Sequence, residues 1–191
     1  MKIAHWVLCA GLIGLPLAAC TETTGPILSA TDFAQRYPAM TGALGPGDRL
    51  KITLYGDDSL TGEYDVLADG TISLPLVGAV KAAGLTIEQL RLAVETRLAA
   101  GFYASPRIAA QVVASRPVYV LGEVNKAGAF PFVPDLTLAK AAALAGGYTY
   151  RARTTVVGVR RSGAAEEVLV AADQAMPLAP GDTVRILERH F

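Results

Sequence analysis

The chain has 191 residues, of which 52% are hydrophobic, enough for one core of ordinary size or two small ones. Lys and Arg together number 17, and so do Asp and Glu, which leaves a formal net charge of zero. Proteins that bind a phosphate backbone present a surface of one sign, so this composition argues against nucleic acid as a partner.

Residues 1–19 have the pattern of a secretory signal peptide. Lys2 precedes an apolar run from Ile3 to Leu17, and small residues then lead into Cys20. An uncleaved anchor is the less favoured alternative, because the run is shorter than the roughly 20 apolar residues of a membrane-spanning helix. Removal of the signal takes Cys9 with it and leaves Cys20 as the single cysteine. An internal disulfide is therefore excluded in the mature chain.

The four residues Leu17 to Cys20 read "LAAC" and resemble the lipobox of bacterial lipoproteins. The resemblance implies cleavage before Cys20 and acyl chains on that residue, which stabilise membrane attachment by about 0.8 kcal/mol per buried methylene. It also implies the outer membrane, because Thr21 stands where an Asp would favour retention at the inner one. We expect Cys20 to be the lipidation site and residues 20–43, which mix Thr, Gly, Pro and Ser, to form the lipidated N-terminus and a tether.

One phrase occurs twice in the chain: "GPGDRLKI" at residues 45–52 and "APGDTVRI" at residues 179–186. Pro-Gly is typical of a turn, and the residues after each Asp alternate between apolar and polar. In the first copy Leu50, Ile52 and Leu54 would point to one side. Each copy is therefore predicted to be a turn that starts a half-buried strand.

The segment "YDVLADGTISLPLVG" predicts a hairpin with strands 64–67 and 71–76 and a tight turn at Asp69-Gly70. Pro75 predicts that the second strand lies at an edge or carries a bulge. A third short strand is expected at residues 79–83.

Residues 86–101 predict a helix that packs on a sheet. Thr86 and Gln89 have capping-box spacing, Gly101 can end the helix, and an apolar stripe runs through Ile87, Leu90, Val94 and Leu98. "SPRIAAQVVA" then predicts a return to strand.

The second half repeats this mixture. "RPVYVLGEV" and "GAFPF" predict partner strands, and "LTLAKAAALAGGY" predicts a helix capped at Thr137 and ended by Gly146-Gly147. "TTVVGVRRSGAAEEVLV" predicts a hairpin in which Arg161 faces Glu166 and Arg160 faces Glu167, each pair contributing about 0.2–1 kcal/mol.

Strands and helices do not alternate regularly enough for a doubly wound sheet, so we expect an α+β fold with two small β-rich modules, each with one main helix. The predicted boundaries are 44–114 and 115–191, with the repeated phrase supplying the final strand.

Few residues suit catalysis. His5 lies in the signal and His190 is penultimate, which excludes triads and histidine metal sites, and we expect no catalytic residue, metal or cofactor. The remaining candidates are the carboxylate pairs Asp57-Asp58 and Glu166-Glu167. Adjacent residues on an extended chain point to opposite faces, so solvated charges are favoured over a glycan hydrolase.

Four aromatic residues flank helix ends, where a sugar ring or a neighbouring subunit could stack. Packing in the core or at its rim is the favoured alternative. These residues are Phe102, Tyr103, Tyr148 and Tyr150.

Together, "LGPGDRLKITLYG", "YDVLADGTISLPLVGAVKAAGLTIEQLRLAVETRL" and "PRIAAQVV" resemble the polysaccharide biosynthesis/export domain of bacterial outer-membrane export proteins. "PVYVLGEVNKAGAFPFVPDLTLAKAAALAGGYT" and "LAPGDTVRI" resemble the soluble-ligand-binding β-grasp domain that follows it in that family. The resemblance covers roughly residues 44–188 and implies that the second module is β-grasp-like.

The resemblance also implies a function: a non-enzymatic outer-membrane lipoprotein that forms a ring of about eight copies and guides capsular polysaccharide or exopolysaccharide outward. Its implied partners are the polysaccharide chain and an inner-membrane polysaccharide co-polymerase. Larger members continue into a membrane-crossing amphipathic helix where this sequence ends at "RILERHF", so we expect a lipid-anchored periplasmic ring or adaptor that joins a separate outer-membrane pore. The alternative is a monomeric periplasmic lipoprotein that binds a glycan or a small ligand.

Overall fold

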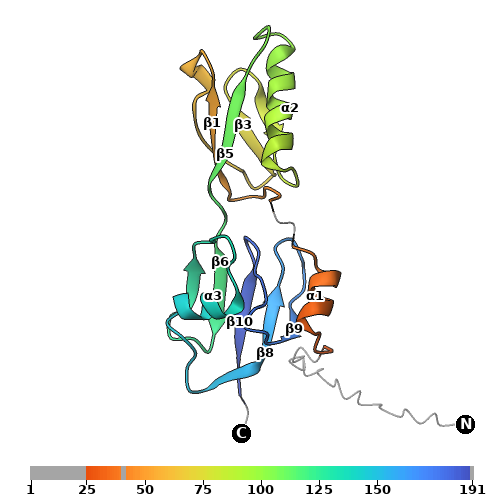
Figure 1. The fold of residues 1–191 in the computed structure, drawn as a ribbon, viewed down its shortest axis with the longest axis vertical. Coiled ribbons are helices and arrows are strands. Elements are labelled where there is room, and N and C mark those ends of the chain that lie inside the picture. The colour runs from red at the N-terminus through yellow and green to blue at the C-terminus, as the bar shows by residue number, and fades with distance from the viewer. Residues whose placement is uncertain (1–24, 40–41, 190–191) are drawn as a thin grey trace, which may run out of the picture.

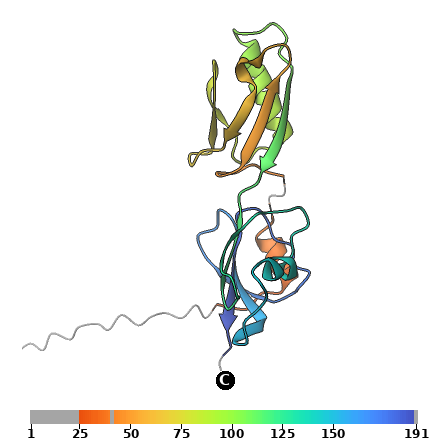
Figure 2. The same ribbon diagram turned by 90° about the vertical axis from the view of Figure 1, so that its left-hand side faces the viewer.

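A computed structural model describes residues 25–39 and 42–189 (Figure 1). The predicted signal, Cys20 and His190 lie outside the described residues. Two separate hydrophobic clusters divide the described chain into two modules that are stacked along the long axis (Figures 1 and 2). We call residues 42–115 module 1, and residues 25–37 with 116–189 module 2. Both modules mix helix and sheet, which confirms the predicted α+β class.

Module 1 has a three-stranded antiparallel sheet of order β2-β1-β5, a separate pair β3-β4, and one long helix that contacts β4 and β5. Its elements are β1 Arg49–Leu54, the 3-10 turn η1 Asp58–Leu60, β2 Gly62–Asp65, β3 Thr71–Leu74, β4 Gly78–Lys81, α2 Ile87–Ala99 and β5 Ile108–Ala114.

The strand and helix patterns of module 1 arise for the predicted reasons. Alternate residues of β1 are buried, as period two requires. Helix α2 begins with a reciprocal capping box: the Gln89 amide donates to the Thr86 hydroxyl, and the Thr86 amide donates to the Gln89 side chain. Leu90, Val94 and Leu98 of α2 are buried. The helix ends at Ala99 and its C-cap is Ala100, one residue before the predicted Gly101.

The predicted hairpin of residues 64–76 is wrong in its pairing. A tight turn does form at Asp69-Gly70, where the Leu67 amide donates to the Thr71 carbonyl at 2.8 Å. However, β2 pairs with β1, and β3 pairs with β4. Strand β3 ends at Leu74, because the next residue is a proline, which cannot donate to a ladder.

Module 2 is a five-stranded sheet of order β7-β6-β10-β8-β9, in which β10 runs parallel to β6 and antiparallel to β8. Helices α1 and α3 share one hydrophobic core with the same face of this sheet. The elements are α1 Ala30–Arg36, β6 Val118–Gly122, β7 Gly128–Phe130, α3 Leu138–Leu144, β8 Ala152–Arg160, β9 Val168–Ala171 and β10 Thr183–Glu188.

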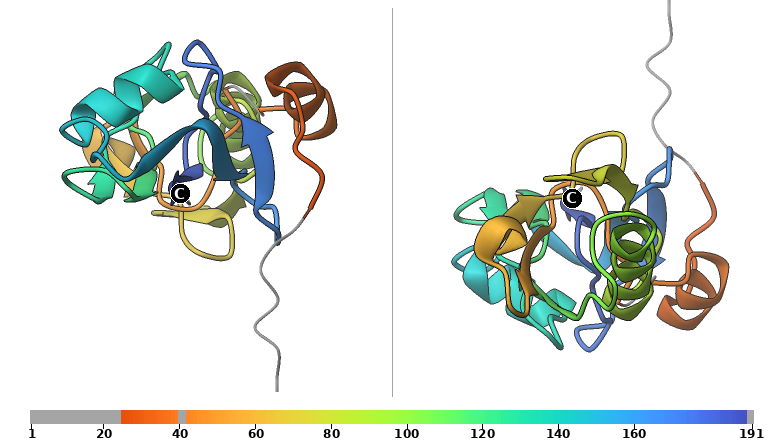
Figure 3. Two further views of the ribbon diagram at one scale, coloured as in Figure 1. Left: turned by 90° about the horizontal axis from the view of Figure 1, so that it is seen from below. Right: turned by 90° about the horizontal axis from the view of Figure 1, so that it is seen from above.

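The segment from Leu28 to Tyr37 is part of module 2, whereas the sequence predicted a tether over residues 20–43. Leu28 bridges to β9, with its amide donating to the Leu169 carbonyl at 2.8 Å (Figure 3). Ser29 then caps α1, and Phe33 of that helix is only 1% exposed. Burying a phenylalanine contributes about 1.5–3 kcal/mol, which stabilises the attachment of this segment to module 2. Module 1 is thus inserted between two parts of module 2.

The β8–β9 hairpin has the predicted register but not the predicted ion pairs. Val159 lies opposite Val168, in the same alignment that would place Arg160 opposite Glu167. Glu167 instead accepts from Arg185 of β10, and Arg161 turns into the core. Gly158 makes the contact between Glu167 and Arg185 possible, because a Cβ at Gly158 would lie 2.2 Å from the Glu167 Oε1.

Candidate functional site at the junction between the modules

The first copy of the repeated phrase lies at the junction and is organised by Asp48. Its Oδ2 accepts from the Gly45 amide and from Arg116 Nη1, both at 2.8 Å, and its Oδ1 accepts from the Arg116 amide at 2.8 Å. The side chain of Asp48 is only 5% exposed. The carboxylate thus closes the four-residue turn from Gly45 to Asp48 and ties it to the end of β5.

The second copy repeats this arrangement around Asp182. Its Oδ2 accepts from the Ala179 amide at 2.8 Å and from Arg161 Nη1 at 2.5 Å, and its Oδ1 accepts from the Ser162 amide at 3.2 Å. The turn predicted for the second copy is therefore confirmed. Burial raises the pKa of the Asp182 carboxyl, while the two amides and Arg161 act in the opposite direction.

Arg161 belongs wholly to module 2. Its guanidinium lies 4.8 Å from the centre of the Phe33 ring, and its Nε donates to the Tyr37 carbonyl at 3.1 Å. A cation over an aromatic face adds attraction to the ion pair with Asp182. Arg161 therefore holds the middle and the C-terminal end of helix α1 against the sheet.

Arg116, in contrast, joins the two modules. While Nη1 binds Asp48 in module 1, its Nε donates to the Pro180 carbonyl of the second Pro-Gly-Asp turn at 3.1 Å. Both turns leave room for this side chain: a Cβ on Gly45 would lie 2.3 Å from Arg116 Nη1, and one on Gly181 would lie 2.9 Å from Arg116 Nε. We call these contacts the Arg116 latch. The repeated phrase thus places two carboxylate-closed turns on either side of one arginine.

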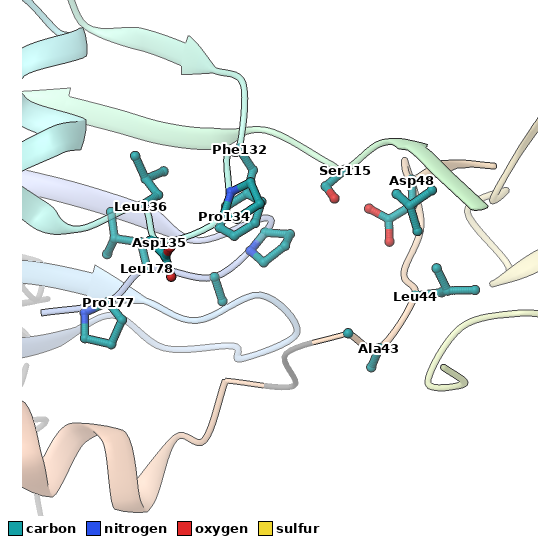
Figure 4. A pocket seen from close by; sticks show the side chains of 14 residues that line it. Ala43, Leu44, Asp48, Ser115, Phe132, Pro134, Asp135, Leu136, Pro177 and Leu178 are labelled. Carbon is teal, nitrogen blue, oxygen red and sulfur yellow. The ribbon is translucent and has the colours of Figure 1, made fainter. Parts of the chain in front are cut away.

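A cavity of about 420 Å³ lies beside the latch, between the two modules (Figure 4). Leu44 and Asp48 border the cavity from module 1. Two loops border it from module 2, one before α3 and one before β10. Its apolar wall is formed by Val112, Phe132, Pro134, Leu136, Pro177 and Leu178. A mostly apolar hollow with a few polar groups can hold a small ligand or a side chain from a partner.

The predicted carboxylate candidates do not meet. Asp57 and Asp58 lie at the end of module 1, and Glu166 and Glu167 lie in the β8–β9 hairpin of module 2. Asp57 caps η1 by accepting from the Ser59 amide at 2.8 Å, and Glu167 pairs with Arg185. The four side chains therefore form no common site.

The predicted aromatic candidates divide between the modules. Tyr103 is half-buried against the core of module 1, while Phe102 is exposed. In module 2, Tyr148 packs against the core and Tyr150 is exposed. Sequence reasoning missed Arg116; the only signal was its position between the last strand of module 1 and the first strand of module 2.

The described residues also bear on metal binding and on membrane insertion. Across residues 25–39 and 42–189, no group of three or more His, Cys, Asp or Glu side chains is placed to hold a metal ion. Within the same ranges, none of the helices has the length and apolar character needed to cross a membrane.

Comparison with known proteins agrees with the division into modules. The profile of the family described as polysaccharide biosynthesis/export protein matches residues 38–113, and the profile described as SLBB domain matches residues 117–170. The two matches support a bacterial polysaccharide biosynthesis/export family and confirm the resemblance stated for both halves of the sequence. Arg116 lies between the two matched segments.

Two curated relatives match part of the chain. "Exopolysaccharide production protein ExoF" of Rhizobium meliloti (strain 1021) is 35% identical over 91 residues, which cover 47% of this chain and 22% of that protein. "Polysialic acid transport protein KpsD" of Escherichia coli is 32% identical over 106 residues, which cover 54% of this chain and 19% of that protein. The matched segments thus span about a fifth of the length of either relative.

Proposed function

We propose that this protein is a non-enzymatic component of a machinery that exports capsular polysaccharide or exopolysaccharide. The observation that carries the proposal is the succession of a polysaccharide biosynthesis/export match and an SLBB match in one chain. The relatives support it, since one is named for exopolysaccharide production and the other for polysialic acid transport.

The proposed form is an oligomeric ring or adaptor, held at the periplasmic face of the outer membrane by acyl chains on Cys20. The fold supports this geometry in one respect: the segment nearest the anchor, from Leu28 onward, is built into module 2. Module 1 would then project away from the membrane. Its proposed partners are the polysaccharide chain, an inner-membrane co-polymerase and a separate outer-membrane pore.

Electron microscopy of the protein extracted from membranes in detergent tests the ring directly. We expect closed assemblies of identical subunits, and deletion of the gene should reduce surface polysaccharide. A strictly monomeric protein at high concentration together with unchanged surface polysaccharide would rule the proposal out.

The anchor has a separate test. Replacing Cys20 by Ser removes the acylated thiol, so the variant is expected in the aqueous fraction after cell lysis, while wild type stays with the membranes. Persistent membrane association of Cys20→Ser would contradict acylation at this residue.

The cavity beside the Arg116 latch favours a second candidate, a monomeric lipoprotein that binds a glycan or small ligand between its modules. Calorimetry with defined oligosaccharides separates the two candidates. A conduit should bind single short glycans weakly, whereas a dedicated receptor should bind one of them with micromolar affinity.

A further inference from the structure

The end of module 1 that faces away from module 2 is formed by two loops, residues 55–61 and 100–107, which we call the tip (Figure 1). The first loop follows β1 and the second follows α2. Strand β1 begins next to Asp48 and has 6 residues. At about 3.3 Å per residue, the tip therefore lies roughly 20 Å from the Arg116 latch, outside any influence of the junction cavity.

Hydrogen bonds hold the two loops of the tip together. The Tyr103 hydroxyl donates to Asp57 Oδ2 at 2.5 Å, and the Tyr55 amide donates to the Arg107 carbonyl at 3.0 Å. The amides of Phe102 and Tyr103 both donate to the Leu98 carbonyl at 3.0 Å, which fixes the second loop to the end of α2. The tip is therefore organised before any ligand arrives, which lowers the entropic cost of binding.

Two large aromatic side chains stand free on these fixed loops. Tyr55 is 67% exposed and Phe102 is 51% exposed. The backbone amide of each residue nevertheless donates a hydrogen bond that fixes its position in the loop. Neither ring takes part in an aromatic or cation contact within the described residues. Their faces are thus available, and aromatic faces are apolar surfaces with a weak negative potential that suits the C–H face of a sugar ring.

The same two loops carry polar groups of the kind that bind sugar hydroxyls. The Asp57 carboxylate and the hydroxyls of Ser59 and Tyr103 lie together, with 3.4 Å between the two hydroxyl oxygens. A shallow hollow of about 290 Å³ adjoins them and is lined by Ala99, Gly101, Phe102, Tyr103 and Ala104. Hydroxyls both donate and accept, so the group can adapt to the hydroxyl pattern of successive residues of a glycan.

The charges at the tip select among glycans. Asp57 and Asp58 lie in the first loop, and Arg107 is the basic residue of the two loops. The carboxylates therefore outnumber the cation by one, and a polyanionic chain would meet a site of its own sign. Within one Debye length, about 8 Å at physiological salt, such charges repel.

We propose that the tip of module 1 is a contact site for an uncharged polysaccharide, with sugar rings stacking on Tyr55 and Phe102. The inference rests on the proposed function, since it names the class of polymer and the surface that meets it. The carboxylate and hydroxyl cluster between the loops takes the hydroxyl groups of the polymer. Binding at the tip is weak for one sugar and gains strength from repetition around an assembly.

The test is NMR on the mature chain carrying Cys20→Ser, titrated with three uncharged hexasaccharides, maltohexaose, cellohexaose and β-1,3-glucohexaose, and with a hexamer of sialic acid. We expect shifts confined to residues 55–61 and 100–107, with at least one uncharged hexasaccharide binding at least tenfold more tightly than the sialic acid hexamer.

The double variant Tyr55→Ala, Phe102→Ala should weaken this binding at least tenfold. Tyr150→Ala is the matched control, because that ring is 82% exposed but lies on module 2, and it should change binding less than twofold. Absence of shifts at the tip with all three uncharged probes, equal losses in both variants, or tighter binding of the sialic acid hexamer would overturn the inference.

Two further readouts keep the inference separate from the proposed function. Sedimentation of the double variant should match wild type; a change in subunit number would assign the rings to a subunit contact and overturn the inference. If rings form and deletion abolishes export but the tip binds no glycan, the inference alone fails.

Discussion

The two Pro-Gly-Asp turns have nearly the same hydrogen bonds but different partners. In module 2, Asp182 pairs with an arginine of its own module, and both side chains are almost completely buried, at 0% and 8% exposed. At the junction, Asp48 of module 1 pairs with Arg116, whose side chain is 15% exposed. Arg116 also donates to the Pro180 carbonyl of module 2. The same phrase therefore stabilises one fold internally and orients two folds relative to each other.

The difference shows where the function of a repeated motif resides. The turn itself is fixed by the Asp carboxylate and the preceding amide, as in Asp48 with Gly45 and Asp182 with Ala179. Whether the turn stabilises one module or orients two modules depends on which strand end supplies the arginine. Changes at the two turns should accordingly separate loss of stability from loss of orientation.

Replacing Asp182 by Ala should have the largest effect. It leaves the Arg161 charge buried without its partner, and removal of one member of a buried pair costs about 3–5 kcal/mol. We expect hydrogen exchange to accelerate throughout module 2, measured by mass spectrometry on the mature chain. Asp173→Ala, at an exposed turn, should change the free energy of unfolding by less than about 1 kcal/mol. Equal effects of the two variants would contradict the structural role of Asp182.

Replacing Arg116 by Ala should loosen the junction while both modules remain folded. The variant loses the guanidinium hydrogen bonds to the Asp48 carboxylate and the Pro180 carbonyl, and hydrogen bonds that involve a charged group contribute about 1.5–3 kcal/mol each. Spin labels at Lys51→Cys and Thr154→Cys should report a broader distance distribution. Arg49→Ala, which breaks the exposed pair with Asp65 next to the same turn, should leave that distribution unchanged. A narrow distribution in Arg116→Ala would show that the latch does not set the orientation.

Gly45→Ala tests the latch without removing a charge. The new Cβ would lie 2.3 Å from Arg116 Nη1, so the guanidinium must move, and overpacking of this kind costs about 1–3 kcal/mol. The expected result is a broadened distance distribution with a smaller loss of stability than in Arg116→Ala. Gly128→Ala is the control, because no atom lies within 4 Å of its new Cβ. If Gly45→Ala gives the same distance distribution as this control, the close approach of Arg116 to Gly45 does not set the orientation of the modules.

The smallest effect is a difference in acid sensitivity between the modules. In module 1, the Tyr103 hydroxyl lowers the pKa of Asp57 and the Arg49 guanidinium lowers that of Asp65, both from 3.8. Their contribution is present above pH 3.8 and is lost as the pH falls through the lower folded values. Burial raises the pKa of Asp182, so acidification does not weaken module 2 through this group.

Urea titrations followed by NMR signals of each module at pH 6 and pH 3 measure this difference. We expect the midpoint of module 1 to fall more than that of module 2. The double variant Asp57→Asn, Asp65→Asn should reduce the gap, and an equal fall in both modules would contradict the assignment.

Local signals in the sequence predicted much of the fold. The caps at Thr86 and Thr137 and the alternation in β1 involve neighbours within a few residues, and the structure confirms each of them. Pairings between distant segments were less predictable. The turn at Asp69-Gly70 forms as predicted, yet β2 pairs with β1 and not with β3, because local alternation does not specify which strands pair.

The candidate site was harder to predict than the fold. Arg161 has the same local sequence context as Arg160, and only tertiary packing against Phe33 and Asp182 distinguishes the buried arginine from the exposed one. The latch likewise depends on residues 68 positions apart. The family resemblance found the modules but carried no signal for the arginine between them.

The central place of β10 has a consequence for how the protein folds as it is synthesised. Residues 42–115 contain every strand of their own sheets, so module 1 can form before the chain is complete. Module 2 cannot complete its sheet until β10 has been synthesised, because β6 and β8 each pair with β10, the final strand of the described chain. During that interval Phe33 and the unpaired strands of module 2 are exposed, so this module has the greater need of a chaperone.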